Sequence, residues 1–271
     1  MCLILFAWRA HPDYPLIFAG NRDEAYDRPS AAADFWSDAP DIYGGRDLDK
    51  GGTWLGLTRS GRFAAVTNYR DGLPRKPAPL SRGDLAAAFL RGTDEPENYL
   101  RTVAPDGDRY GGYSLLVGNL DSLHYLSNRS PGVEKITAGA HGLSNHLLDT
   151  PWPKIRLGKQ RLAALLEAGE AKLVDGLFDA LADRTPAPDN ELPDSGIGLQ
   201  RERELSPAFI AGERYGTRAS TVVLISRRNE VTHIERHFGP LGQPSGPETR
   251  RRFALQVRAK GRKTNSAGQD V

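Results

Sequence analysis

Short apolar runs separated by turn residues dominate the first third of the chain. Residues 3–8 (LILFAW) and 15–19 (PLIFA) are two such runs, and the turn-forming sequence HPDY lies between them. Residues 53–57 (TWLGL) and 63–69 (FAAVTNY) form a second pair around a Ser-Gly turn. Runs of this length with turn signals between them are typical of antiparallel hairpins. The pattern therefore predicts two β-hairpins, and the first of them begins at Cys2.

Two pairs of helices are predicted between the strands. Residues 81–92 begin with a Ser-x-x-Asp capping sequence and end at a glycine, which is typical of a complete helix, and a second helix should follow through about residue 103. Pro153 opens a third helix, which we expect to reach about residue 167. In residues 171–182, leucines recur every four positions, so a fourth helix is predicted there.

Apolar runs of strand length return after each helix pair. Residues 112–118, 122–127 and 133–139 form one group, and residues 220–227 and 229–238 flank a turn near the end of the chain. The order of elements is thus strands, helix pair, strands, helix pair, strands. This order favours α+β layers over a doubly wound parallel sheet. We expect two mainly antiparallel sheets between two helix layers, which is a four-layer αββα sandwich.

The chain shows no internal repeat and no clear linker. Residues 183–200 are rich in Pro, Asp and Gly and are predicted to form a loop. We therefore expect one domain over residues 1–258, followed by a polar, basic and disordered tail over residues 259–271.

Composition and charge narrow the class of partner. The formal net charge is only +2, so nothing in the overall balance indicates a nucleic acid or a membrane surface. No apolar run approaches the roughly 20 residues of a membrane-spanning helix, and the first residues lack the basic start of a signal peptide. We expect a cytoplasmic protein without integral membrane association, whose partner is a small molecule.

A single cysteine stands at position 2. It excludes intrachain disulfides and zinc sites built from several cysteines. Cys2 is either an ordinary apolar residue of the first strand or a nucleophile. If Met1 is removed, the freed α-amine, with an ordinary pKa of about 7.7–8.0, can accept the thiol proton.

A group of polar residues follows the second predicted strand. Asn21, Arg22, Asp23 and Glu24 leave that strand beside the expected position of Cys2. An arginine there would lower the pKa of the thiol and could bind a carboxylate or phosphate through two parallel hydrogen bonds. The alternative is a turn held by salt bridges.

Further polar residues stand at predicted strand ends. Asn145 precedes the loop into the helix at Pro153, where its amide can donate to an oxyanion or cap the turn, and Asn68 is placed similarly. Arg218 stands just before an apolar strand and is a candidate anion-binding residue.

Two sequence patterns resemble metal-binding sites, but neither predicts one. Residues 47–58 begin like a calcium loop but carry glycine and threonine at ligand positions, so calcium is not expected. His233, Glu235 and His237 share one face of a strand and could bind a metal. We expect this face to be solvated, with Ile234 on the opposite face facing the core, and we expect no metal site.

Several of these segments together resemble one family. They are MCLILF at the start, AGNRDE at 19–24, GGTWLGL at 51–57, VTNYR at 66–70, GLSN followed by LLDTPWPK within 142–154, and YGTR at 215–218. In this order, over residues 1 to about 240, they resemble the NRDE family, also called Transport and Golgi organisation 2. That family is similar to the N-terminal-nucleophile hydrolases, a resemblance that also implies the four-layer αββα sandwich.

Within that superfamily, the chain most resembles the bile-salt hydrolases and penicillin V acylases. The resemblance implies a nucleophile at Cys2, a supporting or substrate-binding Arg22, and an oxyanion donor at Asn145. It also implies an acidic residue that orients the α-amine, and either Asp23 or Glu24 can fill this role. The implied activity is a cysteine amidohydrolase, without a cofactor, acting on a C–N bond of a small acylated or amide substrate. Further substrate contacts are expected from a wider set: Asn21, Glu24, Asn68, Arg70 and Arg218.

The resemblance also implies a second hypothesis. Eukaryotic members of the family are linked to haem trafficking, to lipid and acyl-CoA homeostasis and to secretory organisation. In this hypothesis the chain is a carrier that uses the same pocket for haem, with Cys2 or a histidine as axial ligand. For an acyl-CoA ligand, the cations expected near the mouth are Arg22, Arg70 and Arg218.

Overall fold

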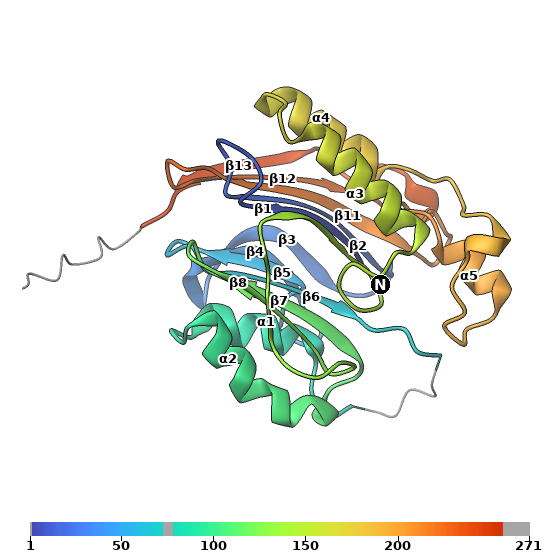
Figure 1. The fold of residues 1–271 in the computed structure, drawn as a ribbon, viewed down its shortest axis with the longest axis horizontal. Helices are drawn as coiled ribbons and strands as arrows, with labels where there is room; N and C mark the ends of the chain where they lie inside the picture. Colours follow the sequence, from blue (N-terminus) through green and yellow to red (C-terminus); the bar gives the residue numbers. More distant parts are fainter. Residues whose placement is uncertain (1, 73–77, 257–271) are drawn as a thin grey trace, which may run out of the picture.

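The computed structural model describes residues 2–72 and 78–256. Two antiparallel sheets pack face to face, and helices cover the outer face of each (Figure 1). The predicted α+β fold with four αββα layers is therefore confirmed. The predicted tail at 259–271 lies outside the described residues, as do Met1 and the last two residues of the predicted domain.

The first sheet has six strands in the order β10-β1-β2-β11-β12-β13. Leu3 and Leu5 of its strand β1 face a core under the helices, whereas Ile4 and Phe6 face the other sheet. This alternation follows from the two-residue period of a strand and explains why every residue of β1 is buried. The strands are β1 (Cys2–Trp8), β2 (Leu16–Ala25), β10 (Gly139–Leu143), β11 (Tyr215–Ile225), β12 (Glu230–His237) and β13 (Thr249–Ala254).

The second sheet has seven strands in chain order, each paired with the next. Its inner face meets the first sheet in one core, where Phe18 of β2 packs edge-on against Phe63 of β6. The strands are β3 (Ser30–Trp36), β4 (Ala39–Asp47), β5 (Leu55–Thr58), β6 (Phe63–Asn68), β7 (Tyr113–Gly118), β8 (Leu123–Ser127) and β9 (Glu134–Lys135).

Each pair of predicted helices covers one sheet (Figure 1). Helix α1 starts at the predicted capping box of Ser81 and Asp84, which exchange reciprocal hydrogen bonds. The helices are α1 (Arg82–Arg91) and α2 (Pro96–Val103) on the seven-stranded sheet, α3 (Pro153–Leu165) and α4 (Glu170–Leu181) on the six-stranded sheet, and the short α5 (Leu199–Leu205). Three 3-10 helices complete the fold: η1 (Ala104–Arg109), η2 (Asp189–Glu191) and η3 (Pro240–Gly242). Within the described residues no helix is long and apolar enough to cross a membrane.

Some boundaries differ from the prediction. The polar group after residue 20 does not leave β2, because β11 pairs with β2 as far as Ala25 and supplies partners for its backbone. Strand β3 was missed because its exposed alanines give no apolar alternation, and strand β13 because its sequence is mostly arginine. Helix α5 begins within the predicted loop 183–200.

The expectation that His233 and Glu235 lie on a solvated face of β12 is wrong. His233 and Glu235 are buried, because β3 and β4 of the second sheet cover this face. The ring of His233 meets Tyr43 edge-on, and the backbone N–H of Ala33 donates to Glu235. In the described part of the chain, no group of three or more His, Cys, Asp or Glu side chains is arranged to hold a metal ion.

Candidate active site

The ends of β1 and β2 place Cys2 directly opposite Arg22. Opposite residues of an antiparallel pair share a face, so both side chains lie on the face that Ile4 and Phe18 turn toward the second sheet. Cys2 is only 7% exposed, and Arg22 is partly buried. Cys2 and Arg22, which lie on separate segments of the sequence, are therefore neighbours in the structure.

The Cys2 thiol lies in surroundings that oppose its ionisation. Burial raises its pKa, and the negative charge of Asp23 adds to this effect. The charge of Arg22 and the backbone N–H of Asp23 act in the opposite direction, but burial is the largest cause. A nucleophilic thiol here needs a base close by.

Asp23 follows Arg22 on β2 and is buried, with 1% of its surface exposed, on the helix side of the strand that Asn21 also faces. Its Oδ1 accepts a hydrogen bond of 2.7 Å from Thr217 Oγ1, at the point where a β-bulge interrupts β11. Burial raises the pKa of Asp23, whereas Lys154, Thr217 and Arg22 lower it. Asp23 thus occupies a position where its ionisation depends on nearby positive charge.

The chain that leaves β10 passes Cys2 and brings Asn145 to the site. Ser144 Oγ donates to the Cys2 carbonyl at 3.1 Å and contacts Asn145 Oδ1 at 3.3 Å. Asn145 Nδ2 donates to the carbonyl of Asn68 at 3.2 Å and to its Oδ1 at 2.9 Å. Asn68 ends β6 in the second sheet, so Cys2 and Asn145 meet where the two sheets come together.

We expected Arg70 to be an exposed cation at the opening of a ligand pocket, but it is buried. Its Nη2 lies 2.9 Å from Glu202 Oε2, and the two side chains are only 6% and 3% exposed. The guanidinium also stacks on Trp152 at 4.5 Å from the ring centre, and the backbone N–H donates to Asn145 at 2.8 Å. Arg70 therefore ties α5 and the start of α3 to the loop that carries Asn145.

Lys154 is a site residue that the sequence reasoning missed. It is 6% exposed, and its Nζ donates to the Leu205 carbonyl at 2.8 Å. Burial lowers its pKa to about 8, and the charges of Asp23 and Cys2 act on it in the opposite direction. Lys154 lies on the buried face of α3, in one row with Gly158 and Leu162, but an apolar period does not mark a charged residue as buried. Its place in the LLDTPWPK segment was the available signal.

A second missed group flanks the site. Tyr69 Oη and His146 Nε2 share a hydrogen bond of 2.6 Å, and His146 Nδ1 lies 2.9 Å from Thr150 Oγ1. The His146 ring also packs against Trp152. Burial lowers the pKa of His146, and the charge of Arg70 adds to this, so the neutral imidazole is favoured.

Asn21 lies on the helix side of β2, away from the Cys2 face. Its Nδ2 donates to the carbonyls of Leu181 and Ala208 at 2.8 and 2.7 Å, and its Oδ1 accepts from Ser220 Oγ at 2.6 Å. These bonds use all of its side-chain donors. The structure gives Asn21 a structural role in place of the expected contact with substrate.

Glu24 and Arg218 lie at the far end of β2. Glu24 is partly exposed and forms ion pairs of 3.9 Å with both Arg22 and Arg28. Arg218 donates to the backbone carbonyls of Ala25 and Arg28, so it braces the turn that follows β2. Both residues border the site through Arg22 and do not reach Cys2 in this arrangement.

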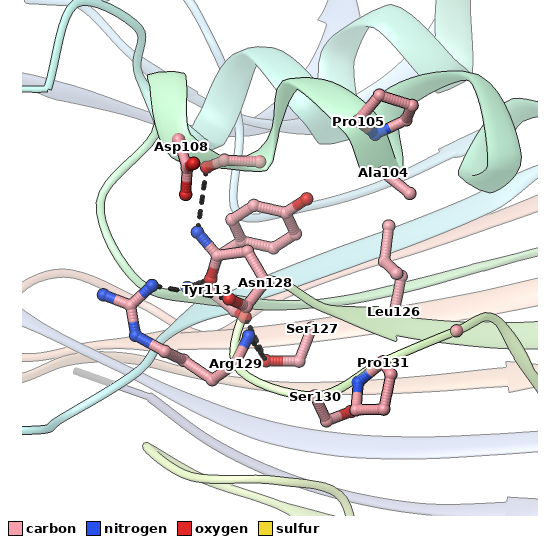
Figure 2. A pocket seen from close by; sticks show the side chains of 12 residues that line it. Ala104, Pro105, Asp108, Tyr113, Leu126, Ser127, Asn128, Arg129, Ser130 and Pro131 are labelled. Carbon is pink, nitrogen blue, oxygen red and sulfur yellow. Dashed lines mark hydrogen bonds between the residues drawn. The ribbon is translucent and has the colours of Figure 1, made fainter.

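A separate cavity of about 480 Å³ lies beside η1 and the end of β8 (Figure 2). Two of its polar side chains are paired: Asn128 Nδ2 donates to the Gly107 carbonyl at 3.0 Å, and Arg129 forms an ion pair with Asp71 at 2.9 Å. Tyr113 belongs to the core under α1 and α2. This cavity is not lined by any of the residues around Cys2.

Solved structures match the chain at low similarity. A conjugated bile acid hydrolase variant from Clostridium perfringens matches with a TM-score of 0.48 and 7% identity, over 96% of this chain and 99% of that chain. An N-acylethanolamine-hydrolyzing acid amidase orthologue from Caenorhabditis elegans matches with a TM-score of 0.38 and 11% identity, over 76% and 98% of the two chains.

Sequence relatives are much more similar. The Transport and Golgi organization 2 homologue of Mus musculus is 36% identical over 87% of this chain and 92% of its own length. The Drosophila melanogaster protein of the same name is 32% identical over 87% and 91%. The model of the family described as Transport and Golgi organisation 2 matches residues 1–240. The chain therefore belongs to the Transport and Golgi organisation 2 family.

Proposed function

We propose that the protein is a cysteine amidohydrolase of N-terminal-nucleophile type that cleaves a C–N bond in a small acylated or amide substrate. The observation that carries this proposal is the buried Cys2 thiol opposite Arg22, with the buried Asp23 carboxylate at the next position of β2 and close enough for its charge to act on the thiol. A buried cysteine that only packs against its neighbours would need neither the charge of Arg22 nor that of Asp23. A thiol that must lose its proton during turnover needs a base and an ion to hold that base.

The proposed reaction starts after removal of Met1. The Cys2 sulfur attacks the substrate carbonyl carbon, and the free α-amine takes the thiol proton and passes it to the leaving amine as the C–N bond breaks. Asn145 Nδ2 turns from Asn68 toward the oxyanion. Water then attacks the thioester, releasing the acid and restoring the thiol. Arg22 lowers the pKa of the thiol.

In this proposal the acidic residue that orients the α-amine is Asp23 and not Glu24. Asp23 is buried and its charge acts on the pKa of the Cys2 thiol, so it can anchor the amine of the same residue. Glu24 is partly exposed and is shared between Arg22 and Arg28.

Intact-mass measurement of the native protein is the first test, and we expect Met1 to be absent. A panel of linear N-acyl amides with short and long acyl chains is then assayed with the processed protein. We expect hydrolysis of at least one member and a loss of more than about 10³-fold in Cys2→Ala. The matched control is Arg129→Gln, outside the site, which should keep full activity.

Two outcomes would overturn the proposal: retained Met1, or hydrolysis that survives in Cys2→Ala. A protein that hydrolyses no amide but shifts the Soret band of added haem, or binds acyl-CoA in calorimetry, would instead be the carrier. In that case Cys2→Ala separates the ligands, because haem ligated by the thiol would be lost and acyl-CoA binding would remain.

A further inference from the structure

The buried ammonium of Lys154 is not used in the proposed reaction. It is the second residue of α3, and its Nζ donates a hydrogen bond to the Leu205 carbonyl at 2.8 Å. A lysine is rarely this buried without a counter-charge, because the interior disfavours an ammonium. One neutral carbonyl does not supply that charge.

Four ionisable side chains face Lys154 from different elements. They are Cys2 on β1, Asp23 on β2, Arg70 just after β6, and Glu202 on α5. Of the two carboxylates, Glu202 is already paired with Arg70 at 2.9 Å. Asp23 is the other carboxylate, and its charge raises the pKa of Lys154 more than that of Glu202 does.

A hydrogen-bonded segment holds Lys154 and Asp23 in one unit. The segment starts at Leu205, which accepts from Lys154, and reaches Ile210, whose backbone N–H donates to Thr217 Oγ1 at 3.0 Å. Thr217 then donates to Asp23 Oδ1 at 2.7 Å. The start of α3, the segment after α5 and the end of β2 meet at this end of the molecule (Figure 1).

Asp23 in turn faces several charged or polar groups. They are the amino-terminal charge, which lowers its pKa most, then Lys154 and Arg22, and the hydroxyl of Tyr26. In the proposed reaction the amino-terminal amine is the group that Asp23 holds, and Arg22 is shared with Glu24. Lys154 is a buried side-chain cation that the fold adds on the side of Asp23 facing α3.

We propose that Lys154 is a positioning residue of the Cys2 site, whose buried ammonium keeps the Asp23 carboxylate ionised. This inference rests on the proposed function, in which an ionised Asp23 holds the α-amine that serves as base. A protonated Asp23 would lose its attraction for that amine in the ammonium form, so the base would no longer be held beside the thiol.

The test reads the protonation of Asp23 directly and needs no substrate. Infrared spectra of the processed protein are recorded across pH, and the C=O band of the protonated Asp23 carboxyl is assigned by subtracting the spectrum of Asp23→Asn. Lys154→Met removes the charge at similar length, whereas Lys154→Arg keeps it. Lys159→Met is the matched control, because Lys159 lies on the same helix and pairs with Asp149 outside the site.

We expect the titration midpoint of Asp23 to rise by about one pH unit or more in Lys154→Met and to stay near the wild-type value in Lys154→Arg and Lys159→Met. Lys154→Gln, which keeps a hydrogen-bond donor near Leu205, should behave like Lys154→Met and replaces it if that variant does not fold. An unchanged midpoint in a folded, uncharged variant would overturn the inference, since a purely structural Lys154 leaves Asp23 unaffected. A protein without amidase activity still gives this result, so the two proposals fail separately.

Discussion

Within the described residues, two buried polar clusters differ in whether burial or pairing decides the pKa of their ionisable groups. The Glu235 cluster lies between the sheets, where the carboxylate accepts from Thr221 Oγ1 at 2.9 Å and from Ala33 N–H at 3.2 Å and lies 3.1 Å from His237. The Cys2 cluster lies at the end of β1 and comprises Cys2, Asp23, Lys154, Asn145 and the Arg70–Glu202 pair.

The pKa directions separate the clusters. In the Glu235 cluster, burial opposes ionisation, but hydrogen bonds and the two histidines prevail and lower the pKa of Glu235 to about 2. In the Cys2 cluster, burial prevails: it raises the pKa of the Cys2 thiol and of Asp23, and lowers that of Lys154. A cluster that only stabilises the fold satisfies its charges, whereas groups whose charged forms are disfavoured by burial are typical of functional sites.

The largest expected effect comes from breaking the Arg70–Glu202 pair. Arg70→Met leaves Glu202 buried without its cation, and we expect the free energy of unfolding to fall by about 4 kcal/mol. Urea unfolding measures this change. The double variant Arg70→Met with Glu202→Met should recover part of the loss, and a double variant as unstable as the sum of the two single ones would contradict a direct pair.

Asn21→Ala should cost about 3 kcal/mol, because it removes the partners of two buried carbonyls and of the Ser220 hydroxyl. Thermal and urea unfolding give this value. The rate of Cys2 alkylation in the folded variant should stay unchanged, since Asn21 lies on the other face of β2. If Asn21→Ala were as stable as the wild type but changed the rate of Cys2 alkylation, Asn21 would be a site residue and not a structural one.

Glu235→Gln should lower the free energy of unfolding by about 2 kcal/mol at neutral pH, through loss of the charged hydrogen bonds. The folded pKa of about 2 lies below the unfolded value of 4.5, so this contribution is present above pH 4.5 and is lost as pH falls toward 2. Urea unfolding at a series of pH values should show the wild-type and variant curves converging over that range. A constant difference would mean that packing, not charge, explains the effect.

The smallest effect on stability is expected from Cys2→Ala. Cys2 behaves as a small buried residue, so we expect a change of about 1 kcal/mol or less, measured by urea unfolding. The contrast with the large loss of turnover proposed above distinguishes a site residue from a structural one. A loss as large as that of Asn21→Ala would show that Cys2 chiefly serves packing.

Local sequence patterns predicted most of the fold. The apolar alternation of β1 and β2, the capping box of α1 and the leucine spacing of α4 each depend on neighbours within a few residues. The arginine-rich β13 and the alanine-rich β3 were missed because they form strands only when an adjacent strand supplies backbone partners.

The candidate site was predicted in part. Cys2, Arg22 and Asp23 follow from a hairpin whose register the two apolar runs determine, and the structure places them together. Arg70 was expected at a mouth and is instead buried against Glu202, a residue of the missed helix α5. Lys154 was overlooked because charge on a helix indicates solvent unless the partners are known.

The sequence alone determined the layers, the first hairpin and the position of the only cysteine, because these depend on residue period and on contacts between chain neighbours. Tertiary structure decided which polar residues are buried and what they face. Burial raises the pKa of Asp23, and one of the charges that lower it is Lys154, which lies more than a hundred residues away in the chain. Glu235 is buried because β3 and β4 cover β12. Burial and electrostatic pairing are properties of packed segments, so no local pattern contains them.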